Sequence, residues 1–206
     1  MIGDPIFITE HNWVLAKRIK PKIKKNNIIL IGGGSGVQKS ELAYTLQAEL
    51  SSDQLQSFVI SLDDYYVCHP SVRHYNRKKN GLDSVGLAEI DWQAIRGICS
   101  NFKKKKPIKF HRVHRFLNEV EKNEICSDEI DVLIVEGLYA NYLKKFKMGD
   151  VSIFLEGNPK QTLAFRKIRK KENEDNSFRQ KVVRKEFRVV SQLRKYANLI
   201  IPFEEK

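Results

Sequence analysis

The stretch Ile28-Ile29-Leu30-Ile31-Gly32-Gly33-Gly34-Ser35-Gly36-Val37-Gln38-Lys39-Ser40 decides the fold, because an apolar run breaks there into glycines and then reaches Lys-Ser. The apolar, β-branched residues favour a buried strand. Glycines let consecutive backbone N–H groups turn toward one concavity, which suits an anion. The stretch therefore predicts a strand, a phosphate-binding loop and the start of a helix.

The loop departs from the pattern G-x-x-x-x-G-K-[ST] at one position. Gly33 fits the first glycine, but Gln38 stands where the second is expected. A glutamine there costs about 1–3 kcal/mol if the position requires a strained φ. Because Lys39 and Ser40 open a helix after the glycines, a plain turn without a ligand is disfavoured. The residues expected to hold the phosphates of a nucleotide are Gly33, Gly34, Ser35, Gly36, Val37, Gln38, Lys39 and Ser40.

Length and composition bound the class of protein. The 206 residues suffice for one α/β domain with a full core, and we expect a single domain over residues 1–206. No apolar run approaches the ~20 residues of a membrane span, and the N-terminus lacks the pattern of a signal peptide. The cysteines are scattered without a C-x-x-C pair, which predicts a reducing, cytoplasmic setting without a zinc site or a disulfide framework.

The formal net charge of +12 has two explanations. Anionic phosphates draw basic residues into a site, whereas a nucleic acid draws them along a face. Basic tracts at 17–25, 103–106 and 179–195 suit the second explanation, although such tracts commonly form solvated surface. Composition does not choose between the two.

Strand and helix patterns alternate through most of the chain. Strands are expected at 28–31, 56–62, 131–135, 151–155 and 198–201, and helices at 42–50, 90–102, 161–171 and 178–196. Residues 67–88 read as a long loop, 108–120 as one or two extended strands, and 121–128 as a turn region. Residues 1–26 read as a helical extension in which Trp13, Val14 and Ile19 pack. The alternation predicts an α/β fold whose parallel sheet of about five strands carries helices on both faces.

Three of the expected strands are followed directly by residues that can bind a ligand. The glycine loop follows Ile31, Asp63 follows Leu62, and Glu136 follows Val135. Ligands of parallel sheets bind at the carboxyl ends of the strands. The loop and both carboxylates are therefore expected at the same edge of the sheet.

These residues suit phosphoryl transfer. Ser40, Glu136 and Asp63 offer the hard oxygen ligands that Mg²⁺ prefers. Asp63 can also take the proton of an acceptor alcohol, work worth ~10²–10⁴ in rate. Arg166 and Arg169 lie three apart on one helix face, and the lid expected over 161–180 would bring their charge to the transferred group. Plainer readings are a turn cap for Asp63, a surface ion pair for Glu136, and solvated charges for both arginines.

The motifs resemble those of the uridine kinase and phosphoribulokinase family of P-loop kinases, from about residue 27 to 202. Ser61-Leu62-Asp63-Asp64-Tyr65-Tyr66 is similar to the family's S-x-D-x-[FY]-Y, whose first aspartate is the catalytic base. Val132-Leu133-Ile134-Val135-Glu136-Gly137-Leu138 is similar to V-x-I-V-E-G-[IL], whose glutamate helps to hold Mg²⁺. Supporting similarities are 83–92 to D-H-P-x-[AS]-x-D-W, 166–169 to the lid pattern R-R-I-x-R, and 195–202 to K-Y-A-D-x-I-I-P.

The resemblance implies a P-loop NTPase fold with a lid helix and a small β-ribbon, ATP and Mg²⁺ as cofactors, and a small-molecule alcohol as substrate. A nucleoside such as uridine or cytidine is the expected acceptor. The residues implied to face it are Tyr65, Tyr66, His114 and Arg115. Phe110 to Arg115 lacks the aspartate of the family's Y-D-F-x-x-H-x-R, so transfer chemistry is better supported than uridine.

Two alternatives stay open. Gln38 suits a relative that binds nucleotide but has lost efficient catalysis, and the basic tracts suit a nucleic-acid-binding protein. Among partners we expect the small molecule rather than a membrane or a nucleic acid. Self-association through the ribbon at 108–120 or the N-terminal helix is also left open.

Overall fold

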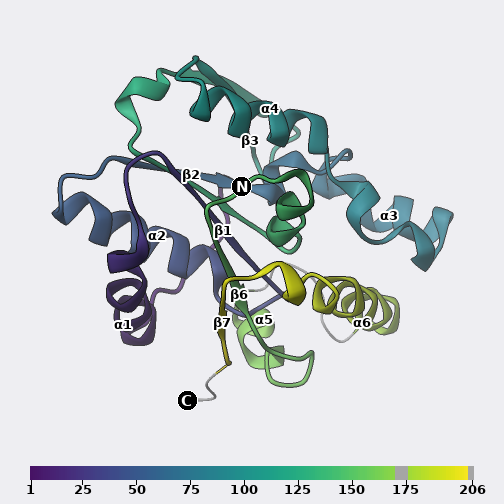
Figure 1. Ribbon diagram of the computed structural model, residues 1–206. Helices are drawn as coiled ribbons and strands as arrows, with labels where there is room; N and C mark the ends of the chain where they lie inside the picture. Colours follow the sequence, from purple (N-terminus) through teal and green to yellow (C-terminus); the bar gives the residue numbers. More distant parts are fainter. Residues whose placement is uncertain (170–175, 204–206) are drawn as a thin grey trace.

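A five-stranded parallel sheet forms the centre of the computed structural model, which describes residues 1–169 and 176–203 (Figure 1). Its strands, in spatial order, are Ser57–Ser61 (β2), Val132–Glu136 (β5), Asn27–Gly33 (β1), Val151–Leu155 (β6) and Leu199–Ile201 (β7). All neighbouring pairs are parallel, which confirms the predicted sheet. The strand with the glycine loop lies at its centre.

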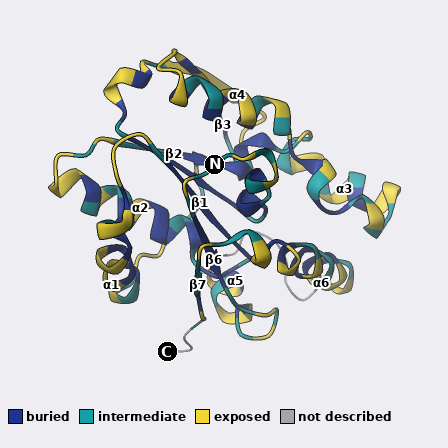
Figure 2. Cartoon of the chain, viewed as in Figure 1, coloured by how far each residue is buried: buried dark blue, intermediate teal, exposed yellow. Residues whose placement is uncertain are grey.

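The side chains of β1 alternate between two hydrophobic cores, one on each face of the sheet. Ile29 and Ile31 pack with α1 (Glu10–Ile19) and α2 (Lys39–Ser52). Ile28 and Leu30 pack with α4 (Trp92–Lys103) and the end of α6 (Ser177–Ser191). Because both faces are covered, the three central strands β5, β1 and β6 are buried along almost their whole length (Figure 2). Each fully buried isoleucine or leucine stabilises the fold by about 1.5–3 kcal/mol.

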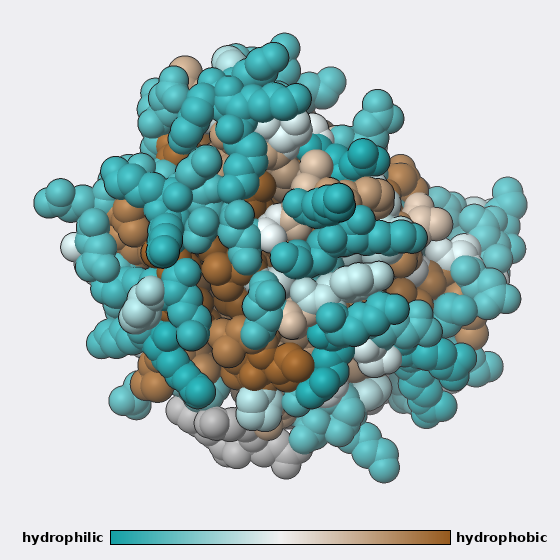
Figure 3. All heavy atoms as spheres, viewed as in Figure 1, coloured by the Kyte–Doolittle hydropathy of each residue, from teal (hydrophilic) through white to brown (hydrophobic). Residues whose placement is uncertain are grey.

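Besides short 3₁₀ helices, the described chain has two further α-helices and a ribbon. They are α3 (Pro70–Asn80), α5 (Leu163–Arg169) and the antiparallel pair β3 (Ile108–Val113) and β4 (Val120–Ile125). Within 1–169 and 176–203, every helix is too short or too polar to traverse a lipid bilayer. Hydrophilic side chains cover most of the face seen in Figure 3, as a chain with 30% charged residues requires.

The prediction of a long loop over 67–88 is wrong, because α3 occupies half of it. Pro70 stands in the first turn, where its missing N–H costs nothing, and Nδ1 of His69 accepts a hydrogen bond from the Ser71 N–H. Gly81, with a φ of 78°, ends the helix. The helix is polar almost all round, so it carries little of the apolar periodicity by which helices are found.

Three smaller predictions also need correction. Residues 120–125 form β4 rather than a turn, because most of this strand is exposed and lacks apolar alternation. The helix α6 ends at Ser191 rather than Tyr196, with a short 3₁₀ turn at Arg194–Tyr196. In α1, Val14 is exposed and Trp13 is 37% exposed, while Asn12, Leu15, Ala16 and Ile19 form the packed face.

Candidate functional site

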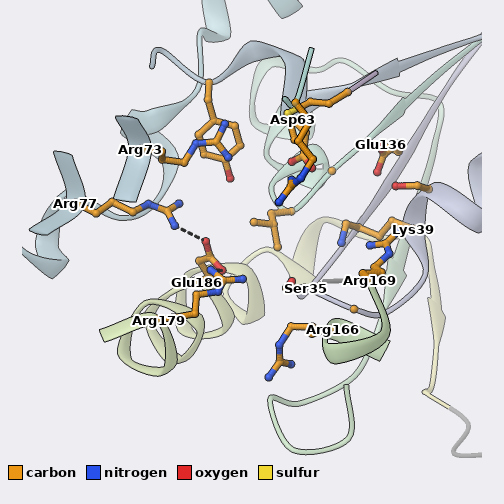
Figure 4. A pocket seen from close by; sticks show the side chains of 17 residues that line it. Ser35, Lys39, Asp63, Arg73, Arg77, Glu136, Arg166, Arg169, Arg179 and Glu186 are labelled. Atoms are coloured by element: carbon orange, nitrogen blue, oxygen red, sulfur yellow. Dashed lines mark ion pairs between the residues drawn. The ribbon is translucent and has the colours of Figure 1, made fainter. Parts of the chain in front are cut away.

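The carboxyl ends of β1, β5 and β2 bring the predicted residues to one cavity. Glu136 pairs in register with Ile31 on one side and with Ser61 on the other. Ser61 Oγ donates a hydrogen bond to Glu136 Oε1 across 2.5 Å. The short 3₁₀ helix Leu62–Tyr65 then places Asp63 at the same edge. Lys39, Ser40, Asp63 and Glu136 line one cavity (Figure 4), so the expected convergence of the strand ends is confirmed.

The loop over 33–40 has the shape that its glycines predict. Gly33 has a φ of +146°, and a Cβ there would lie 2.4 Å from the carbonyl oxygen of Leu155. Lys39 Nζ donates to the carbonyl oxygen of Gly34 across 2.7 Å, so the lysine closes its own loop. Ser35, Gly36, Lys39 and Ser40 line the cavity, whereas the Val37 side chain is buried.

Gln38 adopts the conformation that a glycine would adopt. It caps the start of α2 with a φ of 64° and a ψ of 36°, in the left-handed region. This position therefore does require a positive φ, as the departure from the glycine pattern suggested. Residues other than glycine reach this region at a cost of about 1–2 kcal/mol.

Burial sets the charge balance of the site. Lys39 is only 7% exposed, and burial, together with the charge of Arg169, lowers its pKa to about 8. Glu136 and Asp63 act in the opposite direction on the same ammonium. Burial raises the pKa of Glu136, and the neighbouring charge of Asp63 raises it further. The site thus holds charged groups that a bound phosphate and a cation would satisfy.

The donor set fits Mg²⁺ held jointly with a nucleotide. Ser40, Asp63 and Glu136 line the cavity and supply oxygen atoms. Among the described residues, no cluster of three or more His, Cys, Asp or Glu side chains forms a metal cage. Mg²⁺ commonly binds through one or two carboxylates, water and phosphate oxygens, so two carboxylates and a hydroxyl suffice.

The two arginines of the expected lid both line the cavity, but their guanidinium groups differ in direction. Arg169 Nη2 donates to Glu41 Oε1 across 2.7 Å, next to the loop. Arg166 Nη1 donates to Thr162 Oγ1 and to the carbonyl oxygen of Pro159, at the start of its own helix. Figure 4 shows Arg169 beside Lys39 and Arg166 farther away. Residues 170–175 of the expected lid lie outside the described residues.

Of the four residues implied to face an acceptor, the structure brings two to the cavity. Tyr66 and Arg115 line it. Tyr65 instead packs in the core, where its ring lies 4.3 Å from that of His111. His114 Nε2 lies 2.7 Å from Glu121 Oε1, a contact across the ribbon. Tyr65 and Tyr66 face opposite ways because the 3₁₀ helix ends between them.

The sequence analysis missed four charged residues of the site. They are Arg73 and Arg77 of α3 and Arg179 and Glu186 of α6. Proline at 70 and glycine at 81 were the available signals for α3. In α6, the two charged residues stand seven apart, on the face that also buries Val182 and Val183. A charge kept on the buried face of a helix was the available signal there.

Comparisons with known proteins agree with this geometry. The sequence model of the family described as "Phosphoribulokinase / Uridine kinase family" matches residues 28–201. The uridine kinase of Ureaplasma parvum serovar 3 is 30% identical over 151 residues, which make up 72% of this chain and 70% of the relative.

Two solved structures share the fold. A candidate fructose transport system kinase from Silicibacter sp. TM1040 has a TM-score of 0.67 at 20% identity, covering 93% of this chain and 98% of that one. A candidate uridine kinase from Bacillus stearothermophilus has a TM-score of 0.66 at 15% identity, covering 93% and 97%. At these identities the likeness concerns the fold.

Proposed function

Because this chain belongs to the phosphoribulokinase and uridine kinase family, we propose that it uses ATP and Mg²⁺ to phosphorylate an alcohol of a small molecule. The observation that supports this best is the meeting of Lys39, Ser40, Asp63 and Glu136 around one cavity at the carboxyl edge of the sheet. A lysine, a hydroxyl and two carboxylates are the groups that such a transfer needs.

Each side chain has a role in this proposal. Lys39 and the N–H groups of the loop bind the outer phosphates, and Ser40, Glu136 and Asp63 hold Mg²⁺, which offsets the negative charge of the phosphates. Asp63 takes the proton of the acceptor hydroxyl. At the same time the hydroxyl oxygen of the acceptor bonds to the γ-phosphorus, and the bond between that phosphorus and the ADP oxygen breaks. The transferred group then carries charge that cations stabilise.

The lid arginines supply that positive charge. Arg169 exchanges Glu41 for a phosphate oxygen, and its present distance of 2.7 Å from Glu41 keeps it beside the loop. Arg166 releases the carbonyl oxygen of Pro159 when it turns toward the cavity. Both changes require closure of the helix α5 over the nucleotide.

Two classes of acceptor alcohol have support from the motifs and the comparisons. The motifs and the uridine kinase of Ureaplasma parvum support a nucleoside. The fold shared with the candidate fructose transport system kinase supports a sugar. Tyr66 and Arg115 would contact either one. We assign the activity to the cytoplasm, which contains ATP and keeps thiols such as the three free cysteines reduced.

The test is an assay of ATP consumption over a panel of nucleosides and sugars, with the product ester identified by mass spectrometry. We expect ADP and one phosphate ester in equal amounts. Neither product should form when Mg²⁺ is omitted or when the Lys39→Met variant is used. Tight ATP binding by calorimetry without any ester would favour the nucleotide-binding relative that has lost catalysis. Salt-dependent retention of RNA without ATP binding would favour the nucleic-acid alternative.

A further inference from the structure

The cavity has an excess of positive charge. Seven basic and three acidic side chains line it among the described residues. A nucleotide bound at the loop can engage Lys39 and the lid arginines. The remaining basic residues of the cavity are Arg73, Arg77, Arg115 and Arg179.

Arg73 and Arg77 are two of these four residues. Figure 4 shows them on α3, across the cavity from Lys39 and Arg169, with Asp63 between the two groups. The helix α3 follows the 3₁₀ helix that carries Asp63, so its arginines lie on the side of the proposed base that faces away from the phosphate loop. The two residues are one helical turn apart and share a face of the helix.

Arg77 shows how this helix face holds a carboxylate. Its Nε donates to Glu89 Oε1 across 2.7 Å and its Nη2 to Glu89 Oε2 across 2.9 Å. Its Nη1 lies 3.1 Å from Glu186 Oε1. Arg77 is 5% exposed and its guanidinium is neutralised by two carboxylates, so the residue joins α3 to α6 and is already occupied.

Arg73 presents the same edge without a partner. Its guanidinium carbon lies 3.5 Å from the centroid of the Tyr66 ring, the distance of a stacked pair. Its Nε and Nη2, the two nitrogens with which Arg77 holds Glu89, have no hydrogen-bond acceptor among the described residues, although both are shielded from water. Buried donors are normally satisfied, so this edge is suited to a ligand. The side chain is only half-buried and can turn toward one.

Tyr66 connects this edge to the proposed base. Burial raises the pKa of Tyr66, and the charges of Arg73 and Asp63 act on its hydroxyl in opposite directions. The ring therefore lies within electrostatic reach of both residues. Asp63, Tyr66 and Arg73 all line the cavity, so a small molecule bound there can contact both Asp63 and Arg73.

We propose that the acceptor alcohol carries an anionic group, a carboxylate or a phosphate, which the Nε and Nη2 edge of Arg73 binds while the hydroxyl lies at Asp63. This rests on the proposed kinase function. A planar guanidinium matches both anions with two parallel hydrogen bonds, which a neutral alcohol cannot provide. Arg73 is then a specificity residue for the acceptor.

The experiment compares alcohols that differ in charge: glycerol with glycerate and glycerol 3-phosphate, and ribose with ribose 5-phosphate. We expect kcat/KM at least about tenfold higher for a charged member, the value of one charge-assisted pair. The preferred anion tells a carboxylate site from a phosphate site. Arg73→Gln should raise KM for that acceptor by about tenfold or more and leave KM for ATP within about twofold. The KM of Arg73→Lys for that acceptor should lie between those of the wild type and Arg73→Gln.

Lys79→Gln is the matched control, because Lys79 is exposed on the same helix. It should change neither KM. Equal kcat/KM for charged and neutral alcohols would overturn the proposal while leaving the kinase function standing, as would an equal effect of Arg73→Gln on both. If neither these alcohols nor the nucleosides and sugars of the wider panel are phosphorylated, the kinase function fails. Titration of the same alcohols into the ADP–Mg²⁺ complex then tests the anion site, and affinities unchanged by Arg73→Gln overturn it.

Discussion

Asn12 Nδ2 donates a hydrogen bond to Gln38 Oε1 across 3.1 Å, and this contact joins α1 to the phosphate loop. Asn12 is 1% exposed, and its Oδ1 accepts from the N–H and Oγ1 of Thr9 at the start of α1. Asn12 lies outside residues 28–201, the part matched by the family. A helix beyond the family's core thus holds the residue that replaces the loop glycine.

The left-handed backbone of Gln38 predicts an inverted order of two substitutions. We expect Gln38→Gly to be more stable than Gln38→Ala by about 1 kcal/mol, because only glycine adopts a φ near 64° without a penalty. Elsewhere alanine is commonly the more stable of the two near a helix. Urea denaturation measures the difference, and an alanine variant as stable as the glycine variant would show that the backbone here is not strained.

The contact between Asn12 and Gln38 predicts that their substitutions are not additive. Asn12→Ala should lower the free energy of unfolding by about 0.5–1.5 kcal/mol more in the wild type than in the Gln38→Ala background. The hydrogen bonds to Thr9 are lost in both backgrounds and cancel. Equal losses in the two backgrounds would mean that the side-chain contact contributes nothing to stability.

The lowered pKa of Lys39 predicts how ATP affinity depends on pH. Below pH 8 the ammonium is charged in the free protein, and above it the amine is neutral. Phosphates bind the charged form, so binding above pH 8 must take up a proton, and affinity should fall about tenfold per pH unit. Calorimetry in buffers of different ionisation enthalpy counts that proton. Lys39→Met should bind weakly, with no such slope between pH 8 and 9.5, and a slope retained in this variant would assign the proton elsewhere.

The position of Asp63 predicts a loss of turnover without a loss of binding. Asp63→Asn should lower kcat by about 10²-fold or more, because the amide cannot take the proton, while ATP affinity changes little. Asp83→Asn is the control, because Asp83 is fully exposed and paired with Lys185, although its stretch is similar to a family motif. Turnover that survives in Asp63→Asn would remove Asp63 from the role of base.

Local patterns in the sequence determined the sheet, the loop and the phosphate side of the site. Continuous apolar runs indicate strands that are buried on both faces. The carboxyl ends of parallel strands share one edge of the sheet, so Lys39, Asp63 and Glu136 were expected to lie together. Tertiary packing decided the acceptor side. The helix α3 lacks an apolar stripe, and its place follows from Arg77 pairing with Glu186, more than a hundred residues away. The periodicity of apolar residues in the sequence indicates which residues are buried. It does not indicate which charged residues share a cavity, because these lie on elements that come together only in the folded chain.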